Sequence, residues 1–234
     1  MKSILRYIST ALLVVLLLGS CKKDIMTYGS EDSVYFTEDS TNYTFVDKKS
    51  SVITDTVIVR VKLIGKLSEK DRTLNVTVDS GDAVEGKDYT VLKPVVLQKD
   101  SNFVSVKVVL NRTTDLLTKN KKIWLGLKNS DDIKAADFPP HTQHKLTFSD
   151  KVEKPDWWDS YFYLFNYSDT RMRFYIDVMG STLAPNQYTG GVGLDFSVVI
   201  YLLKAATIEY NQTHTEPLSD EYGPINWDVS WIDG

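Results

Sequence analysis

Four acidic residues crowd one stretch of the chain and are the first candidates for chemistry: Asp79, Asp82, Glu85 and Asp88. Their carboxylates are the hard oxygen ligands that Ca²⁺ prefers, but their spacing does not match an EF-hand loop. We interpret them as solvated turn acids. Asp82, Glu85 and Asp88 stay weak calcium candidates, and we expect no metal or other cofactor beyond a covalent lipid.

The three histidines do not form a recognisable metal motif. His141 and His144 follow Pro139-Pro140, and His214 lies far away in the sequence. The prolines prevent a helix from aligning the first pair, and no cysteine is close enough to complete a tetrahedral site. We therefore expect histidines on the surface near the start of a strand.

Catalytic motifs are not found in the sequence. It has no Gly-x-Ser-x-Gly elbow and no glycine-rich phosphate loop, and its single cysteine is Cys21. Paired carboxylates for glycoside hydrolysis stay an open alternative, because only their separation in space decides that chemistry. The acids nearest the C-terminal aromatics are Asp220 and Glu221. We expect a protein that is not an enzyme.

Four tryptophans in the last third of the chain are candidate glycan-binding residues: Trp157, Trp158, Trp227 and Trp231. An exposed aromatic face stacks on the C–H groups of a sugar ring, and a large ring covers about 150–250 Å². The alternative is that the rings dock the C-terminal segment onto the sandwich, which applies above all to whichever of Trp157 and Trp158 faces inward. Trp231, near the chain end, is the best candidate for exposure.

The N-terminal segment has the pattern of a secretory signal. Lys2 and Arg6 precede an apolar stretch from Ile8 to Leu18, which is shorter than the ~20 residues of a membrane-spanning helix. The run Leu18-Gly19-Ser20-Cys21 resembles the bacterial lipobox, in which lipid is attached to the cysteine that becomes the mature N-terminus. The resemblance implies acyl chains (palmitate) at Cys21; the alternative is an ordinary signal peptide followed by a chance cysteine.

Charge and composition limit the partners. The formal net charge is −4, and the basic residues are interspersed with acids, which argues against nucleic acid as a partner. An aromatic content of 12% is high for a disordered chain and indicates a globular protein. Contact with the membrane would therefore come from the lipid anchor rather than from electrostatic adhesion.

Strand patterns fill the first half of the mature chain. Apolar residues alternate with polar ones or form short runs, separated by Gly, Asp, Asn and Lys clusters, which predicts an antiparallel two-layer sandwich. The predicted strands cover residues 34–36, 57–63, 74–78, 95–97, 104–110, 123–127 and 146–148.

One turn in this region resembles that of a known type of sandwich. The sequence Ala83-Val84-Glu85-Gly86-Lys87-Asp88-Tyr89 is followed by a short strand, a polar turn and a long alternating strand. The pattern resembles the Calx-beta type of immunoglobulin-like domain and covers Leu74 to Leu127 most clearly. Gly86 is expected to have a positive φ, and Asp88 to accept hydrogen bonds from turn amides.

The chain changes character after residue 150. Pro155 can occupy a first helical turn, and the aromatics from Trp157 to Phe165 recur at helical spacing. Arg171 to Met179 fits a strand or a helix equally, Gly180 to Gly193 reads as a loop, and apolar residues from Val199 to Tyr210 predict a helix of about four turns. The tail beyond these is expected to be irregular. We predict four parts: a signal peptide (1–20), a tether (21–32), a mainly β sandwich domain (33–150) and a small aromatic-rich helical C-terminal module (151–234).

Three motifs resemble a family of uncharacterised surface lipoproteins of Bacteroidota: Lys23-Asp24-Ile25-Met26-Thr27-Tyr28, Pro155-Asp156-Trp157-Trp158 and Leu218-Ser219-Asp220-Glu221-Tyr222-Gly223. Members are typically encoded with polysaccharide-uptake transporters of the outer membrane. The resemblance implies a non-catalytic outer-membrane lipoprotein at the cell surface, accessory to polysaccharide capture through glycan binding or transporter association. The alternative is a structural subunit of a surface complex that binds no glycan, and an enzyme acting on glycans is a third reading.

Overall fold

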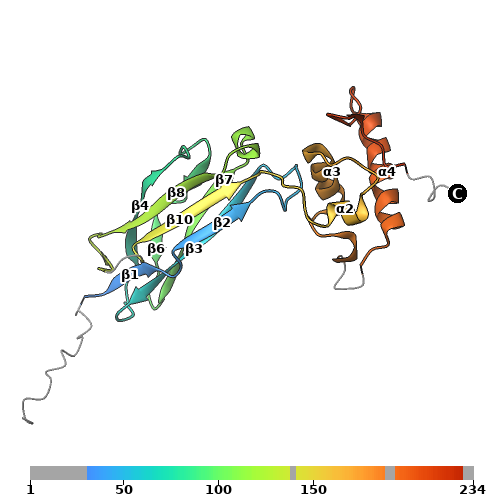
Figure 1. Ribbon diagram of the computed structural model, residues 1–234. Helices are drawn as coiled ribbons and strands as arrows, with labels where there is room; N and C mark the ends of the chain where they lie inside the picture. The colour runs from blue at the N-terminus through green and yellow to red at the C-terminus, as the bar shows by residue number, and fades with distance from the viewer. Residues whose placement is uncertain (1–30, 138–140, 188–192, 229–234) are drawn as a thin grey trace, which may run out of the picture. The chain divides into compact units, whose positions relative to one another are not determined.

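The computed structural model describes residues 31–137, 141–187 and 193–228 (Figure 1). The signal peptide, Cys21 and Trp231 lie outside the described residues, as does nearly all of the tether. The described residues from Asp32 onward belong to one compact unit. The division at residue 150 therefore stays a prediction, although separate hydrophobic clusters lie on its two sides.

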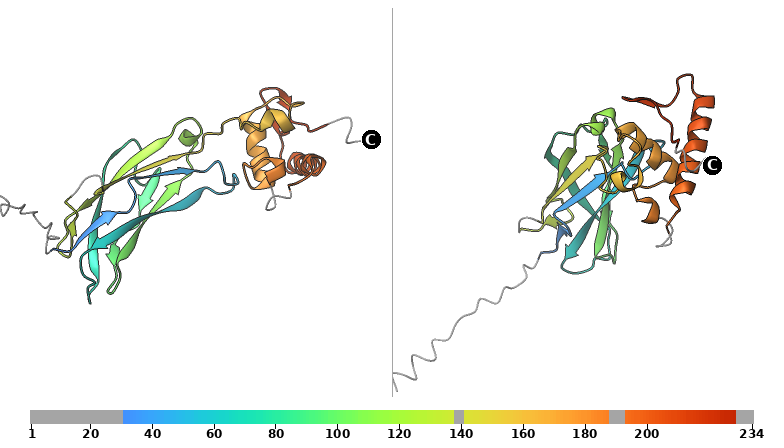
Figure 2. Two further views of the ribbon diagram at one scale, coloured as in Figure 1. Left: turned by 60° about the horizontal axis from the view of Figure 1, so that its bottom comes forward. Right: turned by 45° about the vertical axis from the view of Figure 1, so that its right-hand side comes forward.

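Ten strands form two five-stranded sheets that face each other across a hydrophobic core (Figure 2). The first sheet, sheet A, has the order β5-β7-β3-β1-β9, and the second, sheet B, has the order β2-β10-β8-β4-β6. The strands are β1 (Ser33–Phe36), β2 (Ser40–Thr44), β3 (Thr54–Ile64), β4 (Arg72–Gly81), β5 (Tyr89–Val91), β6 (Val95–Leu97), β7 (Phe103–Asn111), β8 (Lys121–Lys128), β9 (Lys134–Ala135) and β10 (Gln143–Ser149). A 3₁₀ turn, η1 (Thr114–Leu117), precedes β8.

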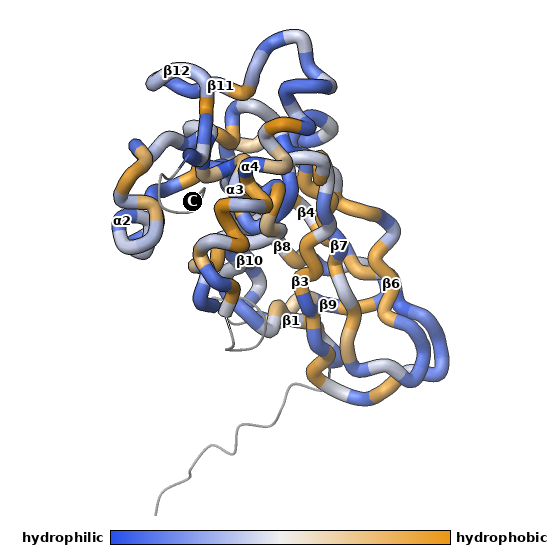
Figure 3. The backbone as a smooth tube through the Cα atoms, turned by 90° about the vertical axis from the view of Figure 1, so that its right-hand side faces the viewer, coloured by the Kyte–Doolittle hydropathy of each residue, from blue (hydrophilic) through white to orange (hydrophobic). Residues whose placement is uncertain are grey.

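Along these strands, buried and solvent-facing side chains alternate. Every second residue of β3 from Val57 to Leu63 is buried while its neighbours are exposed, which is the period-two pattern of a strand with one solvated face. Figure 3 colours the backbone by hydropathy and shows hydrophobic and hydrophilic segments interspersed along the sandwich strands. The predicted mainly β sandwich is therefore confirmed, with one correction. The sheets are not purely antiparallel, because β1 pairs with β9, and β2 with β10, in parallel.

The helical part has its own apolar core. Its elements are α2 (Trp158–Tyr161), α3 (Asp169–Met179), η2 (Pro185–Gln187), α4 (Phe196–Thr213) and a hairpin of β11 (Ser219–Asp220) and β12 (Gly223–Pro224). The ambiguous segment from Arg171 is helical, and Gly180 ends it with a φ of 75°. Helix formation across the aromatics from residue 157 was overestimated, because α2 is a single turn. The hairpin corrects the expectation of an irregular tail.

Candidate functional site

The tryptophans predicted to bind glycan lie mostly in the core of the helical part. Trp158 is 0% and Trp227 is 1% exposed, so neither ring face is available to a sugar. Trp158 stacks on Phe162, with the ring centroids 4.8 Å apart. The indole of Trp227 donates a hydrogen bond of 3.2 Å to Thr207 Oγ1 and lies beside the guanidinium of Arg171. For these two residues burial contradicts the glycan-binding prediction, and both rings pack within the core of the helical part.

Trp157 is only partly buried, but it is also held in place. Its indole nitrogen donates to the carbonyl of Thr182 at 3.2 Å, and its ring lies 5.3 Å from that of Tyr175. Glycan binding by Trp157 and by Trp231, which lies outside the described residues, stays a prediction. Each described C-terminal tryptophan therefore makes contacts within the helical part of the protein.

The acidic turn is a structural feature of the sandwich. Gly86 has a φ of 80°, and Asp88 accepts a hydrogen bond of 2.9 Å from the Val84 amide, as predicted. Asp88 is fully buried, and the ammonium group of Lys121 lies 2.7 Å from its carboxylate. This ammonium supplies the positive charge that a metal ion would bring. Among the described residues, no group of three or more His, Cys, Asp or Glu side chains has a metal-binding arrangement.

The acid considered for glycoside hydrolysis is also part of the framework. Asp220 has a fully buried side chain; Arg171 Nε donates to it at 2.6 Å and Ser168 Oγ at 2.9 Å. Burial acts to raise its pKa, but hydrogen bonds from the Tyr222 amide, Ser168 and Arg171 outweigh it and hold the pKa below its ordinary value. A general acid for glycoside hydrolysis needs the opposite shift. Glu221 is exposed.

The histidines are only partly where they were expected. His214 is exposed, whereas His144 is 1% exposed and sits within β10, which corrects the prediction of a surface residue. The two ring nitrogens of His144 lie 2.7 Å from the Glu38 carbonyl oxygen and 3.0 Å from the Thr41 hydroxyl. These contacts join β10 to β2 and to the residues that precede β2.

The outer face of sheet B presents a tryptophan that the sequence interpretation overlooked. Trp124 lies in β8 between buried Ile123 and Leu125, so its side chain must point to the solvent face. The ring is partly exposed. Its cross-strand neighbours are Lys145 on β10 and Ser80 on β4, and the Lys145 ammonium lies 6.0 Å from the ring centroid. Alternation alone was enough to locate this side chain.

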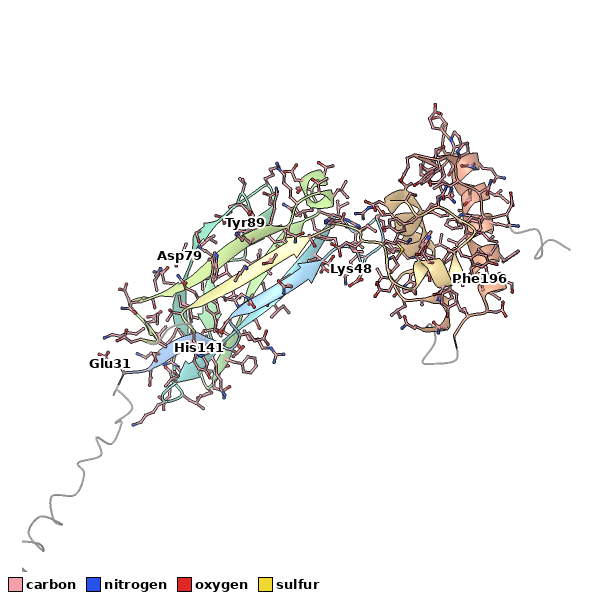
Figure 4. The ribbon with its side chains drawn as sticks, viewed as in Figure 1. Glu31, Lys48, Asp79, Tyr89, His141 and Phe196 are labelled. Carbon is pink, nitrogen blue, oxygen red and sulfur yellow. The ribbon has the colours of Figure 1, made fainter. Side chains whose placement is uncertain are left out.

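A set of hydrogen-bonding groups lies on the same face, on strands β4, β8 and β10. Gly126 has no side chain, and the Asp79 carboxylate occupies the space above it: a Cβ atom on Gly126 would lie 2.4 Å from Asp79 Oδ2 (Asp79 is labelled in Figure 4). Lys128 Nζ donates to Asp79 at 2.8 Å, and Thr77 Oγ1 donates to it at 2.7 Å. Hydrogen bonds from Lys128, Thr77 and Gln143 hold the pKa of Asp79 below its ordinary value, against the effect of burial. Asp79 is therefore an ionised acceptor at neutral pH.

Together, these residues form a mixed binding surface, which we call the Trp124 face: Trp124, Asp79, Thr77, Lys128, Gln143 and Lys145. A partly exposed ring supplies an apolar platform, and donors and acceptors lie to one side of it, around Gly126 two residues further along β8. This combination suits a ligand with apolar C–H faces and many hydroxyl groups. An open pocket of about 390 Å³ lies at the β4–β6 edge of the same sheet, lined by residues 73–76 and 93–95.

A family comparison covers most of the chain. Residues 20–181 match a family described as "Domain of unknown function (DUF4843)". The chain belongs to this family. No curated protein matches the chain. Among the described residues, no helix has the length and apolar character to cross a membrane.

Solved structures similar to this DUF4843 protein include a Calx domain and proteins of unknown function. The apo form of the Calx CBD1 domain has a TM-score of 0.40 and 16% identity, covering 52% of this chain and 99% of that one. A protein of unknown function from Bacteroides ovatus has a TM-score of 0.37 and 11% identity, with 49% and 43% coverage. A second Bacteroides ovatus protein has a TM-score of 0.35 and 14% identity, with 50% and 45% coverage.

Proposed function

We propose that this DUF4843 protein is a non-catalytic outer-membrane lipoprotein that helps to capture polysaccharide, with the Trp124 face as its glycan-binding surface. The observation that carries the proposal is a partly exposed indole on the same sheet face as a group of ionised and amide hydrogen-bonding side chains. Asp220 is buried and paired with Arg171, which supports a binding role for the protein rather than catalysis. The lipobox-like run before Cys21 supports attachment to the membrane surface.

Affinity electrophoresis of the exported protein against neutral soluble polysaccharides tests glycan binding. Trp124→Ala should weaken retardation at least about tenfold, the equivalent of about 1.4 kcal/mol lost with one aromatic platform. Tyr201→Ala, an exposed aromatic on α4, is the matched control and should leave retardation unchanged. Wild-type protein that migrates freely in every polysaccharide, or equal losses in both variants, would contradict the proposal.

The anchor is tested separately at Cys21. Labelled palmitate should appear on the wild-type protein, and Cys21→Ser should abolish the label and release the protein from membranes, since acyl chains supply the attachment. An unlabelled wild-type protein would refute the anchor without affecting the glycan test.

The second candidate function is a structural subunit, and one surface favours it. Helix α4 exposes large apolar side chains at helical spacing, among them Val198, Tyr201 and Ile208, of which Tyr201 is 69% exposed. Exposed apolar side chains grouped in this way are typical of protein interfaces. This candidate predicts that Tyr201→Ala, rather than Trp124→Ala, abolishes co-purification with a membrane partner.

A further inference from the structure

The outer face of sheet A has a different chemistry from the Trp124 face. On the central strand β3, Ile58, Arg60 and Lys62 point outward, since they alternate with buried valines and Leu63. On the neighbouring strand β7, Phe103 and Lys107 are exposed in the same way. We call these five residues, together with Tyr35 on β1, the sheet A face.

The register brings these side chains into rows across the sheet. Lys62 is the cross-strand partner of both Tyr35 and Phe103, so one row reads aromatic, cation, aromatic. Lys107 is opposite Ile58 in another row. Cross-strand neighbours lie about 5 Å apart, and outward residues on one strand repeat about every 7 Å. The cations and rings therefore form one continuous surface.

The positive charge of this face is not neutralised by the described part of the molecule. Arg60, Lys62 and Lys107 form no ion pair with another described residue, and the outward strand positions of sheet A hold no Asp or Glu. The charge is also local. Residues 33–150 contain 18 basic and 16 acidic residues, whereas residues 151–234 contain 5 and 12. A cationic sheet face is thus present on a chain of net charge −4.

Aromatic rings within the cationic surface narrow the choice of ligand. Binding to anionic lipid head groups would require only cationic side chains on a surface that faces the bilayer, and it would not need the aromatic rings. The Tyr35–Lys62–Phe103 row instead matches a polymer that carries both anionic groups and apolar ring faces. Arg60 adds a planar guanidinium, which pairs in a bidentate manner with carboxylate or sulfate oxygens. Phe103 is 60% exposed, so its ring is accessible for stacking.

We propose that the sheet A face binds an anionic polysaccharide, with Arg60, Lys62 and Lys107 contacting its carboxylate or sulfate groups and Phe103 stacking on its sugar rings. The proposal concerns the opposite sheet from the Trp124 face and goes beyond the proposed binding of neutral glycan. Either surface can fail its test while the other passes.

The experiment measures binding of the exported protein to alginate, which carries carboxylates, and to heparin, which carries sulfates, at several salt concentrations. The triple variant R60Q/K62Q/K107Q should weaken binding at least about tenfold at low salt and lower the slope of log K against log salt by about one per cation removed. Phe103→Ala should weaken binding without changing that slope, because it removes no charge. Retention of one polymer but not the other identifies the anionic group.

The matched control K70Q/K99Q/K119Q removes three exposed lysines from loops and changes the net charge by the same amount. It should retain binding. Equal losses in the two triple variants, equal binding to single-stranded DNA, or a wild-type protein retained by neither polymer would each overturn the proposal. Circular dichroism of each variant separates lost binding from lost folding. Trp124→Ala should leave the salt slope unchanged.

Discussion

Replacement of Asp88 by alanine should destabilise the sandwich strongly, because Asp88 is a buried carboxylate with three partners. Lys121 Nζ is 2.7 Å away, the Val84 amide 2.9 Å and Thr113 Oγ1 3.3 Å. Removal of one member of a buried ion pair costs about 3–5 kcal/mol. Lys121 retains Asp115 at 3.0 Å, so we expect the lower end, about 3 kcal/mol. For a chain of this size that is a fall in Tm of about 6–12 °C.

The direction of the pH dependence follows from the pKa shifts. Burial acts to raise the pKa of Asp88, but hydrogen bonds from Lys121 and Val84 outweigh it, so the pKa lies below its ordinary value. Hydrogen bonds from Lys121 and Lys87 lower the pKa of Asp115 to about 2. Burial acts to lower the pKa of Lys121, but its two carboxylate partners outweigh it and the pKa is raised. The stabilisation by the ion pairs of Lys121 with Asp88 and Asp115 should therefore be complete between about pH 4 and pH 10. It should be lost at lower pH, as the carboxylates are protonated, and at higher pH, as Lys121 loses its proton.

The assay is thermal unfolding followed by circular dichroism, with Asp82→Ala as the matched control. Asp82 is an exposed acid of the same turn that accepts one hydrogen bond, from the Lys122 amide, so its removal should cost no more than about 1.5 kcal/mol. The double variant Asp88→Leu/Lys121→Met should recover most of the loss, because an apolar pair replaces the buried charges. Similar Tm values for Asp88→Ala and Asp82→Ala, or a higher wild-type Tm in millimolar calcium, would refute this account of the turn.

Two further predictions test the rest of the framework. Asp220→Ala should leave the buried Arg171 without its carboxylate, cost about 3–5 kcal/mol and shift the fluorescence of the nearby Trp227 to the red, whereas the exposed Glu221→Ala should do neither. Gly126→Ala should displace the Asp79 carboxylate by steric overlap and weaken neutral-glycan binding; in an Asp79→Ala background the same substitution should cause no additional loss, and an additional loss would contradict the assigned contact.

Period-two alternation made the sandwich predictable. Val57, Val59 and Val61 alternate with polar or solvated residues, and a half-buried strand is the structure in which that pattern buries one face. The turn was also predictable, because a glycine with positive φ and an acidic side chain that accepts amide hydrogens have specific local signatures. The parallel pairing of β2 with β10 was not, since pairing between distant segments leaves little local signal.

The site residues were harder to predict, because burial of an aromatic side chain depends on tertiary packing. Trp158 and Trp227 have the composition of a glycan platform but pack into a core with Phe162. Trp124 has no cluster of aromatic residues around it in the sequence, but its side chain is partly exposed. The alternation that predicted strand β8 already placed Ile123 and Leu125 inward, and it therefore placed the residue between them on the solvent face. Clusters of tryptophan in a single chain thus indicate a core before they indicate a ligand.

The charge distribution makes the two binding surfaces separable by experiment. The segment 151–234 has 12 acidic and only 5 basic residues, and the whole chain has a net charge of −4, so both repel a polyanion. Retention on an anionic polymer at low salt must therefore come from a local cationic surface, and the salt slope counts the cations that make contact. Neutral polysaccharide has no such slope, so binding through Trp124 should be nearly independent of salt. A salt titration of the wild-type protein with one neutral and one anionic polymer thus separates charge-dependent from charge-independent binding, and the R60Q/K62Q/K107Q variant assigns the charge-dependent part to the sheet A face.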